Sequence, residues 1–137
     1  MTVSYEKFVP TYTAMHIPFW EGLKTHHLVL QRCDSCTKFR FTPKEICPYC
    51  HGREWTWTPV SGKGTVYTFS VVHRAPMPAY QADVPYVIAH VEIPEGPRIM
   101  SNLVHVDPEA ITIGMPVQVL FEDVTPELTL FKWEPAR

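Results

Sequence analysis

The placement of the cysteines constrains this chain more than any other feature. All four lie in one 18-residue stretch as two Cys-x-x-Cys pairs, Cys33 with Cys36 and Cys47 with Cys50, and ten residues separate the pairs. Two residues between cysteines let both sulfurs of a tight turn point to one side. Two such turns that face each other supply four thiolates in a tetrahedron, which is the arrangement that zinc prefers. The spacing therefore predicts a zinc ribbon with one structural zinc per chain.

Two other interpretations use the same cysteines. Four cysteines allow three disulfide pairings, but the N-terminal stretch has no secretory signal, and disulfides persist mainly in oxidising compartments. Iron also binds between paired turns of this kind, although Thr37 stands where a glycine would ease the first turn. Zinc is the preferred prediction. A closed site with four cysteine ligands has no position for water or substrate and leaves no thiolate free for acyl transfer.

Length and composition fit a protein of ordinary domain size. The chain has 137 residues, of which 45% are hydrophobic and 19% are charged, so it has enough apolar material for a core. No apolar run approaches the ~20 residues that a membrane-spanning helix needs. We therefore expect a cytoplasmic protein with reduced cysteines and no membrane contact.

Residues 1–27 predict an N-terminal arm and a short helix. Pro18 suits the first helical turn, and Phe19, Trp20 and Leu23 then fall on one helical face. This stripe either packs into the core, the commoner outcome for apolar stripes, or forms an aromatic patch of Phe19 and Trp20 that docks on a partner protein. Residues 28–56 follow as the predicted zinc ribbon.

From residue 57 onward the sequence has a β pattern. Short runs of β-branched and aromatic residues alternate with turns rich in glycine and proline. The tract over residues 74–85 holds three prolines and predicts a long loop. Five or six short antiparallel strands predict a small barrel or sandwich over residues 57–137. The predicted fold class is therefore mainly β, with a short helical segment and a zinc ribbon before the strands.

The loop between the two cysteine pairs is unusually apolar and has cations beside its aromatic rings. Phe39 and Phe41 alternate with Arg40, and Lys44 follows. Exposed aromatic side chains edged by cations suit an anionic, partly apolar ligand. These four residues are therefore candidate contacts for such a ligand or for a partner protein.

Catalytic motifs are absent from the sequence. It has no G-x-S-x-G, no paired-carboxylate motif and no H-E-x-x-H. Residues 61–64, SGKG, lack the first glycine and the final Ser/Thr of a phosphate-binding loop, so they predict a hairpin turn. His73 and Arg74 precede the long loop and are further candidate ligand contacts, because a guanidinium group can pair with a phosphate. A solvated strand end is the equally supported alternative.

Several segments together resemble one known family. The segments FWEGLKTHHLVLQRCDSC, CPYC, VSGKGTVYTFSVVHR, VPYVIAHVEI and SNLV with IGMPVQVLFEDV resemble the domain of unknown function 35 family, in the family's order and over roughly residues 16–135. The resemblance implies a rubredoxin-like zinc ribbon followed by an oligonucleotide/oligosaccharide-binding (OB) fold barrel. The sequence departs from the family pattern at Thr37, where glycine is frequent.

The resemblance also implies a function. Members of this family form complexes with thiolases, with hydroxymethylglutaryl-CoA synthase pairs and with thiolase-like aldolases, and the partner carries the catalytic residues. The resemblance thus implies an accessory, acyl-CoA-associated subunit in a hetero-oligomer with a thiolase-like protein. Such a subunit helps bind the substrate or shapes its channel and is not an enzyme on its own.

Two functions from other classes remain as alternatives. Zinc ribbons and small barrels also bind single-stranded nucleic acid through aromatic side chains and basic grooves. Residues 1–62 carry seven Lys/Arg against five Asp/Glu, and residues 63–137 carry five against nine, which gives +2 and −4. Binding to a phosphate backbone needs positive potential, so the barrel half disfavours nucleic acid. An autonomous acyltransferase or hydrolase that uses a histidine ranks last, because no motif positions a base against a nucleophile.

Overall fold

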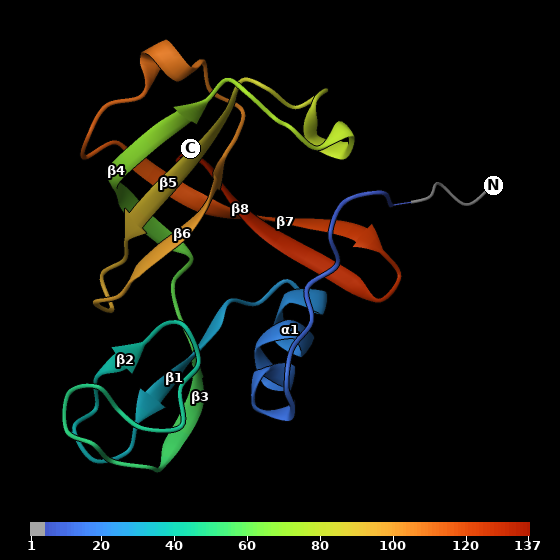
Figure 1. The fold of residues 1–137 in the computed structure, drawn as a ribbon. Helices are drawn as coiled ribbons and strands as arrows, with labels where there is room; N and C mark the ends of the chain where they lie inside the picture. Colours follow the sequence, from blue (N-terminus) through green and yellow to red (C-terminus); the bar gives the residue numbers. More distant parts are fainter. Residues whose placement is uncertain (1–4) are drawn as a thin grey trace.

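The structure is a computed structural model that describes residues 5–137, and it is mainly β (Figure 1). The first four residues of the predicted arm lie outside this range. The short 3-10 turns are η1 (Ala14–His16), η2 (Pro78–Tyr80) and η3 (Pro108–Ala110), and the α-helix is α1 (Ile17–Lys24). The strands are β1 (Val29–Cys33), β2 (Phe39–Arg40), β3 (Trp55–Pro59), β4 (Lys63–Val72), β5 (Tyr86–Glu92), β6 (Arg98–Leu103), β7 (Pro116–Thr125) and β8 (Leu128–Pro135).

The cysteine-containing part forms a small antiparallel sheet in the order β2-β1-β3. The central strand β1 places Gln31 opposite Arg40 of β2 and opposite Trp57 of β3. We call this sheet and the two cysteine turns the ribbon. The strand β3 belongs to the ribbon as far as Pro59, so the chain leaves the ribbon through a paired strand.

The predicted hairpin turn at residues 61–64 is wrong. The strands on either side of it belong to different sheets, because β3 pairs with β1 whereas β4 pairs with β5 and β7. Ser61 and Gly62 instead connect the ribbon to the barrel, and Lys63 and Gly64 begin β4. Gly64 is required for close approach, because a Cβ atom there would lie 2.5 Å from Val91 Cγ1 and 2.7 Å from the Glu92 carbonyl oxygen.

Five strands close into a barrel in the order β4-β5-β6-β8-β7. Neighbouring strands are antiparallel except β6 and β8, which are parallel and pair at Leu103 and Trp133. The alternation of the strands turns one set of side chains inward, and Trp133 is completely buried among them. A short helix, a ribbon and a five-stranded barrel confirm the predicted fold class.

An aromatic cluster joins the helix, the ribbon and the barrel. Phe19 of α1 has its ring centroid 5.9 Å from that of Phe41 in the ribbon and 6.0 Å from that of Phe131 in β8. Helix α1 contacts both β1 and β8, and it lies beside the ribbon below the barrel (Figure 1). Because Phe19 is only 4% exposed, we infer that these rings fix the ribbon relative to the barrel.

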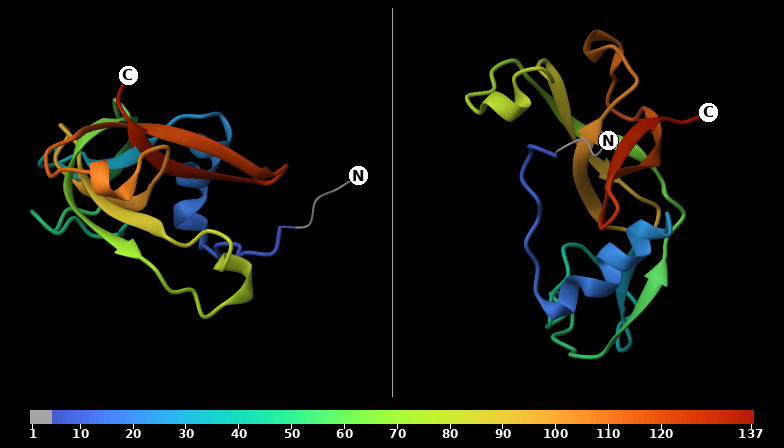
Figure 2. Two further views of the ribbon diagram at one scale, coloured as in Figure 1. Left: turned by 90° about the horizontal axis from the view of Figure 1, so that it is seen from above. Right: turned by 90° about the vertical axis from the view of Figure 1, so that its right-hand side faces the viewer.

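The N-terminal arm climbs from α1 along the outside of the barrel towards the loop that carries η2 (Figure 2). Lys7 Nζ lies 2.6 Å from Asp83 Oδ2, and the Phe8 N–H donates to the Tyr80 hydroxyl at 3.3 Å. The predicted long loop therefore has a partner in the arm. Among the helices of residues 5–137, none has the length and apolar character needed to cross a bilayer.

Candidate functional site

The two cysteine turns have the same backbone design. The Cys33 carbonyl accepts a hydrogen bond from the Thr37 N–H, and the Cys47 carbonyl accepts one from the His51 N–H, both at 2.9 Å. Thr37 and His51 also share a left-handed backbone, with φ of 66° and 65°. Glycine adopts this conformation without steric cost, whereas a residue with a Cβ atom is strained there. The glycine that the family pattern favours at position 37 therefore has a physical reason.

The four sulfur atoms are arranged as a metal site requires. They all lie within 4.8 Å of one another, with 3.5 Å between Cys33 and Cys50 and 3.7 Å between Cys36 and Cys47. Four sulfurs around one zinc at ~2.3 Å would be ~3.8 Å apart, whereas a disulfide holds its sulfurs at ~2.05 Å. All four cysteines are free. The donor set fits zinc, and the disulfide interpretation is wrong for this structure.

The ionisation of the thiols also favours a cation at their centre. Burial opposes ionisation of Cys47, but the N–H groups of Cys50 and Tyr49 outweigh it and lower its pKa to about 6. The Gly52 N–H favours the Cys50 thiolate, yet hydrogen bonding with Cys33 and burial raise the Cys50 pKa to about 11. Several thiolates this close together repel one another unless a cation lies among them.

Arg40, one of the cations beside the aromatic rings of the loop between the cysteine pairs, is buried. Its side chain is 2% exposed, because the pairing of β2 with β1 sets Arg40 beside Gln31. Arg40 Nε donates to Gln31 Oε1 at 3.0 Å, and Arg40 Nη2 donates to the Lys44 carbonyl at 2.8 Å. The Lys44 N–H donates to the same Gln31 oxygen at 2.7 Å. Arg40 is thus one of the packed residues of this loop, and it holds the backbone of the loop between the cysteine pairs.

A hollow of about 580 Å³ lies beside the ribbon, where the three parts of the molecule meet. We call it the interdomain cleft. Its lining is mainly apolar and comes from the helical segment, the ribbon and the barrel: His16, Phe19, Trp20, Phe41, Thr42, Pro43, His90, Arg98, Met100 and Phe131. Predicted contacts from two segments, Phe19 and Trp20 of the helix and Phe41 of the ribbon, thus meet at one site. Apolar clefts between domains are common ligand sites.

A second hollow of about 340 Å³ adjoins the cleft and carries more charge. We call it the basic hollow. The predicted contacts Arg40 and Lys44 line it together with Arg98, and Glu92 is the acid on the same wall. Arg98 also lines the interdomain cleft. The Arg98 guanidinium lies 3.7 Å from the centre of the Tyr67 ring, which positions the cation. Two exposed cations at the end of an apolar cleft suit an anionic group on a ligand.

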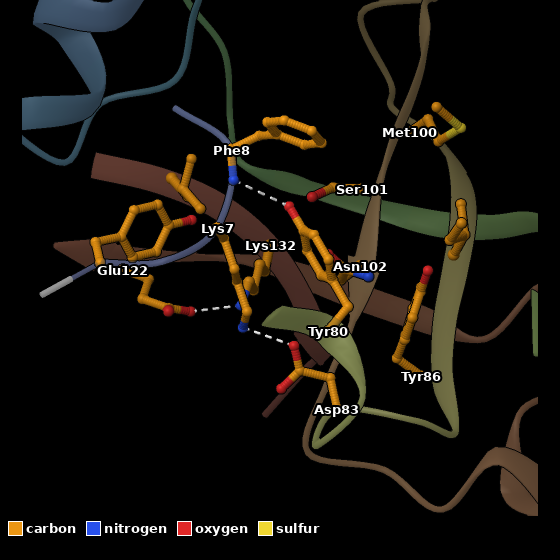
Figure 3. A pocket seen from close by; sticks show the side chains of 13 residues that line it. Lys7, Phe8, Tyr80, Asp83, Tyr86, Met100, Ser101, Asn102, Glu122 and Lys132 are labelled. Carbon is orange, nitrogen blue, oxygen red and sulfur yellow. Dashed lines mark hydrogen bonds and ion pairs between the residues drawn. The ribbon is translucent and has the colours of Figure 1, made fainter. Parts of the chain in front are cut away.

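A third hollow of about 360 Å³ lies beneath the N-terminal arm, and we call it the arm pocket (Figure 3). The arm supplies Tyr5, Lys7 and Phe8, and the loop around η2 supplies Tyr80 and Asp83. The strands β5, β6, β7 and β8 supply the remaining walls: Tyr86, Ile88, Met100, Ser101, Asn102, Glu122, Leu130 and Lys132. The pocket therefore exists only where the arm, the long loop and the barrel come together.

Strand β6 connects the three hollows. Arg98, Met100 and Asn102 occupy alternate positions on its outer face. Arg98 lines both the basic hollow and the interdomain cleft, and Met100 lines both the cleft and the arm pocket. Asn102 lines the arm pocket. Sequence analysis missed all three. Their alternation with the buried Ile99 and Leu103 was the available signal, since it places these polar and flexible side chains on one exposed face.

Three predicted contacts, Phe39, His73 and Arg74, lie outside these hollows. His73 and Arg74 are exposed just after β4 and line none of the three hollows. Phe39 packs against the core, and the Arg32 guanidinium lies 5.3 Å from the centre of its ring. Of the two predicted docking residues, Phe19 is a core residue, and Trp20 is half-buried and stacks on Tyr12.

The described residues do not assemble a nucleophile with a base at the cleft. His16 Nδ1 lies 3.0 Å from Thr13 Oγ1, but Thr13 is not part of the cleft lining. Asp123 accepts the Thr129 hydroxyl at 2.6 Å and lies 3.0 Å from His26 Nε2. Here the carboxylate separates the hydroxyl from the imidazole, so His26 cannot take the threonine's proton. This contact instead ties the end of α1 to the β7–β8 hairpin.

Comparison with known families divides the chain into two matched regions. Residues 20–56 match a family described as the ChsH2 rubredoxin-like zinc ribbon domain, and residues 57–122 match the ChsH2 C-terminal OB-fold domain. These two matches agree with the cysteine geometry and with the closed five-stranded barrel.

Three curated relatives span different shares of their own length. A probable enoyl-CoA hydratase alpha subunit of Thermomonospora curvata is 43% identical over 119 residues, which cover 86% of this chain but 37% of the relative. A DUF35 domain-containing scaffold protein of Methanocaldococcus jannaschii is 40% identical, with 80% of this chain and 79% of the relative covered. The benzoylsuccinyl-CoA thiolase subunit BbsA of Thauera aromatica is 32% identical over 53% of this chain and 48% of its own length.

A solved structure is similar over almost the whole chain. It is described as an Ltp2-ChsH2(DUF35) aldolase and has a TM-score of 0.84 and 39% sequence identity. The alignment covers 94% of this chain and 100% of that chain. The likeness therefore extends over both the ribbon and the barrel.

Proposed function

Since the chain belongs to the DUF35 family, with a rubredoxin-like zinc ribbon followed by an OB-fold domain, we propose that it is a non-catalytic accessory subunit of a thiolase-like enzyme. In this proposal it forms a hetero-oligomer with that enzyme and helps to hold its acyl-CoA substrate. The names of two similar proteins support the partner class, one as a thiolase subunit and one as an aldolase that contains a DUF35 chain.

The interdomain cleft is the observation that carries this proposal. Its mainly apolar walls end at Arg98, and Lys44 lies in the adjoining basic hollow. A CoA thioester combines anionic phosphates with a long uncharged chain, so it matches a cleft that is apolar along its length and cationic at one end. The described residues lack an activated nucleophile beside the cleft, which supports assigning the chemistry to a partner.

The chain's own residues would bind and orient the substrate. Lys44 and Arg98 would hold the phosphates, while Phe41 and Met100 would contact the uncharged chain and exclude water. One zinc would be held by the four sulfurs of Cys33, Cys36, Cys47 and Cys50. When bound, zinc supplies a structural cross-link and no reaction step. Reduced cysteines of this kind support a cytoplasmic location.

The test compares two arginines: Arg74, the candidate ligand contact from the sequence, and Arg98, the candidate from the structure. Arg98 lines the cleft, whereas Arg74 is exposed outside it. We expect Arg98→Met to weaken binding of benzoyl-CoA to the co-expressed complex about tenfold, the effect of losing about 1.4 kcal/mol. Arg74→Met should leave the dissociation constant unchanged. Isothermal titration of each purified complex measures both values, and the wild-type preparation shows whether a thiolase-like protein co-purifies at equal stoichiometry.

Two results would contradict the proposal. The partner claim fails if the chain purifies alone after co-expression with a thiolase-like enzyme. The ligand claim fails if Arg98→Met and Arg74→Met bind benzoyl-CoA equally well. A labelled oligonucleotide that binds with a steep salt dependence would instead support the nucleic-acid alternative.

A further inference from the structure

The arm pocket lies at the position on the barrel where OB folds bind ligands. Ligands of this fold contact the second and third barrel strands, together with the loop between the first two strands and the loop between the last two. In this chain the second and third barrel strands are β5 and β6, the first loop carries η2, and the last loop joins β7 to β8. The arm pocket is lined from β5, β6 and the η2 loop, and from β7 and β8 next to their hairpin.

The charged side chains of the arm pocket neutralise one another. Lys7 pairs with Asp83 at 2.6 Å, and Lys132 pairs with Glu122 at 2.7 Å (Figure 3). No other Lys, Arg, Asp or Glu occurs in its lining. An ionic ligand would have to compete with these pairs, whereas an uncharged group would leave them intact. The arm pocket differs in this respect from the basic hollow.

The remaining walls suit a ring that also accepts or donates a hydrogen bond. Four aromatic side chains, Tyr5, Phe8, Tyr80 and Tyr86, line the pocket. Asn102 Nδ2 donates to the Val87 carbonyl at 3.2 Å, which leaves its side-chain oxygen for a ligand donor. The volume of about 360 Å³ is more than twice the ~150 Å³ of a cavity that holds benzene. One ring with substituents, or a fused pair of rings, fits this space.

We propose that the arm pocket binds an uncharged, ring-bearing group and that the arm residues Tyr5, Lys7 and Phe8 close over it. Under the proposed function, on which this identification rests, the group is the acyl end of the CoA thioester. The thioester then follows the outer face of β6, with its phosphates near Arg98 and its acyl ring near Asn102. These positions are four residues apart, or ~13 Å along a strand, and Met100 lies between them on both the cleft and the pocket.

The experiment uses probes without the CoA nucleotide, so that phosphate binding cannot mask the pocket. The zinc-loaded full chain is titrated with S-benzoyl-N-acetylcysteamine and with S-acetyl-N-acetylcysteamine, and the NMR signals of the tyrosine rings are followed. We expect the benzoyl probe to bind at least about tenfold more tightly than the acetyl probe, with shifts for Tyr80 and Tyr86.

A matched pair of variants keeps the test independent of folding. Phe8 is 70% exposed and lines the pocket, whereas its neighbour Val9 is 58% exposed and does not. Phe8→Ala should lower the affinity for the benzoyl probe several-fold, and Val9→Ala should bind this probe as tightly as the wild type does. Because both side chains are exposed, neither change should alter the barrel's melting temperature.

The outcomes separate this inference from the proposed function. Equal affinity for the two probes, or unchanged benzoyl binding in Phe8→Ala, overturns the arm pocket even if the thiolase-like partner co-purifies. Selective benzoyl binding without any thiolase-like partner upholds the pocket's preference for a ring and removes the thioester identification along with the proposed function. Selective binding together with the partner supports both.

Discussion

The ribbon and the barrel are both built from strands but are stabilised by different means. The barrel buries a continuous apolar core, which includes Val91, Ile99 and the completely buried Trp133. The ribbon adds Leu30 to that core, and otherwise it buries Cys33 and Cys47 together with the polar pair Gln31 and Arg40. A sheet with two long strands and one short strand cannot bury enough apolar surface by itself. We therefore expect the ribbon to depend on metal ligation by its four cysteines and on a buried hydrogen-bond network, whereas the barrel depends on packing.

The difference also explains how the clefts keep their shape. The residues that line them come from rigid strands on the barrel side and from a loop on the ribbon side. Phe41 can form one wall of the interdomain cleft only if that loop is fixed. The two cysteine turns hold the loop at both ends, and Arg40 holds it near the middle.

Metal removal should have the largest effect, and it should act on the ribbon alone. Metal analysis should find about one zinc per chain, and Cys47→Ser should abolish it. The amide signals of residues 28–59 should then lose their dispersion, because zinc binding and folding are coupled in small ribbons, while the barrel signals persist. A zinc content near zero with a native ribbon spectrum would refute the structural role of the metal.

The loss of Trp133 should have the next largest effect, and it should act on the barrel. Trp133→Ala removes a completely buried side chain and should lower the free energy of unfolding by ~3–5 kcal/mol in a urea titration. Trp57→Ala, at a half-buried position of the ribbon sheet, is the control and should cost much less. Zinc content should stay unchanged in both. Equal destabilisation by the two changes would argue against separate modes of stabilisation.

The smallest effect is expected for Arg40, whose role differs between the sequence and the structure. Arg40→Met leaves Gln31 and the Lys44 carbonyl with fewer hydrogen bonds and should cost ~1–3 kcal/mol. The exposed Arg32 is the matched control, and Arg32→Met should change stability by less than ~0.5 kcal/mol. If Arg40→Met weakened CoA binding without loss of stability, Arg40 would be a ligand contact, as its sequence context suggested.

The sequence predicted those parts of the molecule whose signals are local. The spacing of Cys33, Cys36, Cys47 and Cys50 specifies the sulfur cluster, because two intervening residues determine each turn. The β pattern after residue 57 likewise contains the five barrel strands, since alternation along a strand reflects its two faces.

The features that the sequence did not predict depend on contacts between distant segments. Arg40 becomes buried only through its register with Gln31, and the arm pocket forms only when Lys7 meets Asp83 across the barrel. The ligand-facing strip of β6 had a local signal in its alternation, but its importance follows from the three hollows beside it. Pairings between distant segments leave little trace in a single sequence.

The parallel contact between β6 and β8 has a consequence for where the barrel opens locally. These two strands pair at Leu103 and Trp133, and the Ser101 hydroxyl adds a hydrogen bond to the Phe131 carbonyl at 2.7 Å. The seam is thus held by fewer backbone hydrogen bonds than the antiparallel pairs beside it, so local opening should begin there. A molecule in the arm pocket touches Met100 on one side of this seam and Leu130 on the other. Ligand binding would therefore hold β6 and β8 together. Amide hydrogen exchange along both strands would slow, even though no new backbone hydrogen bond forms.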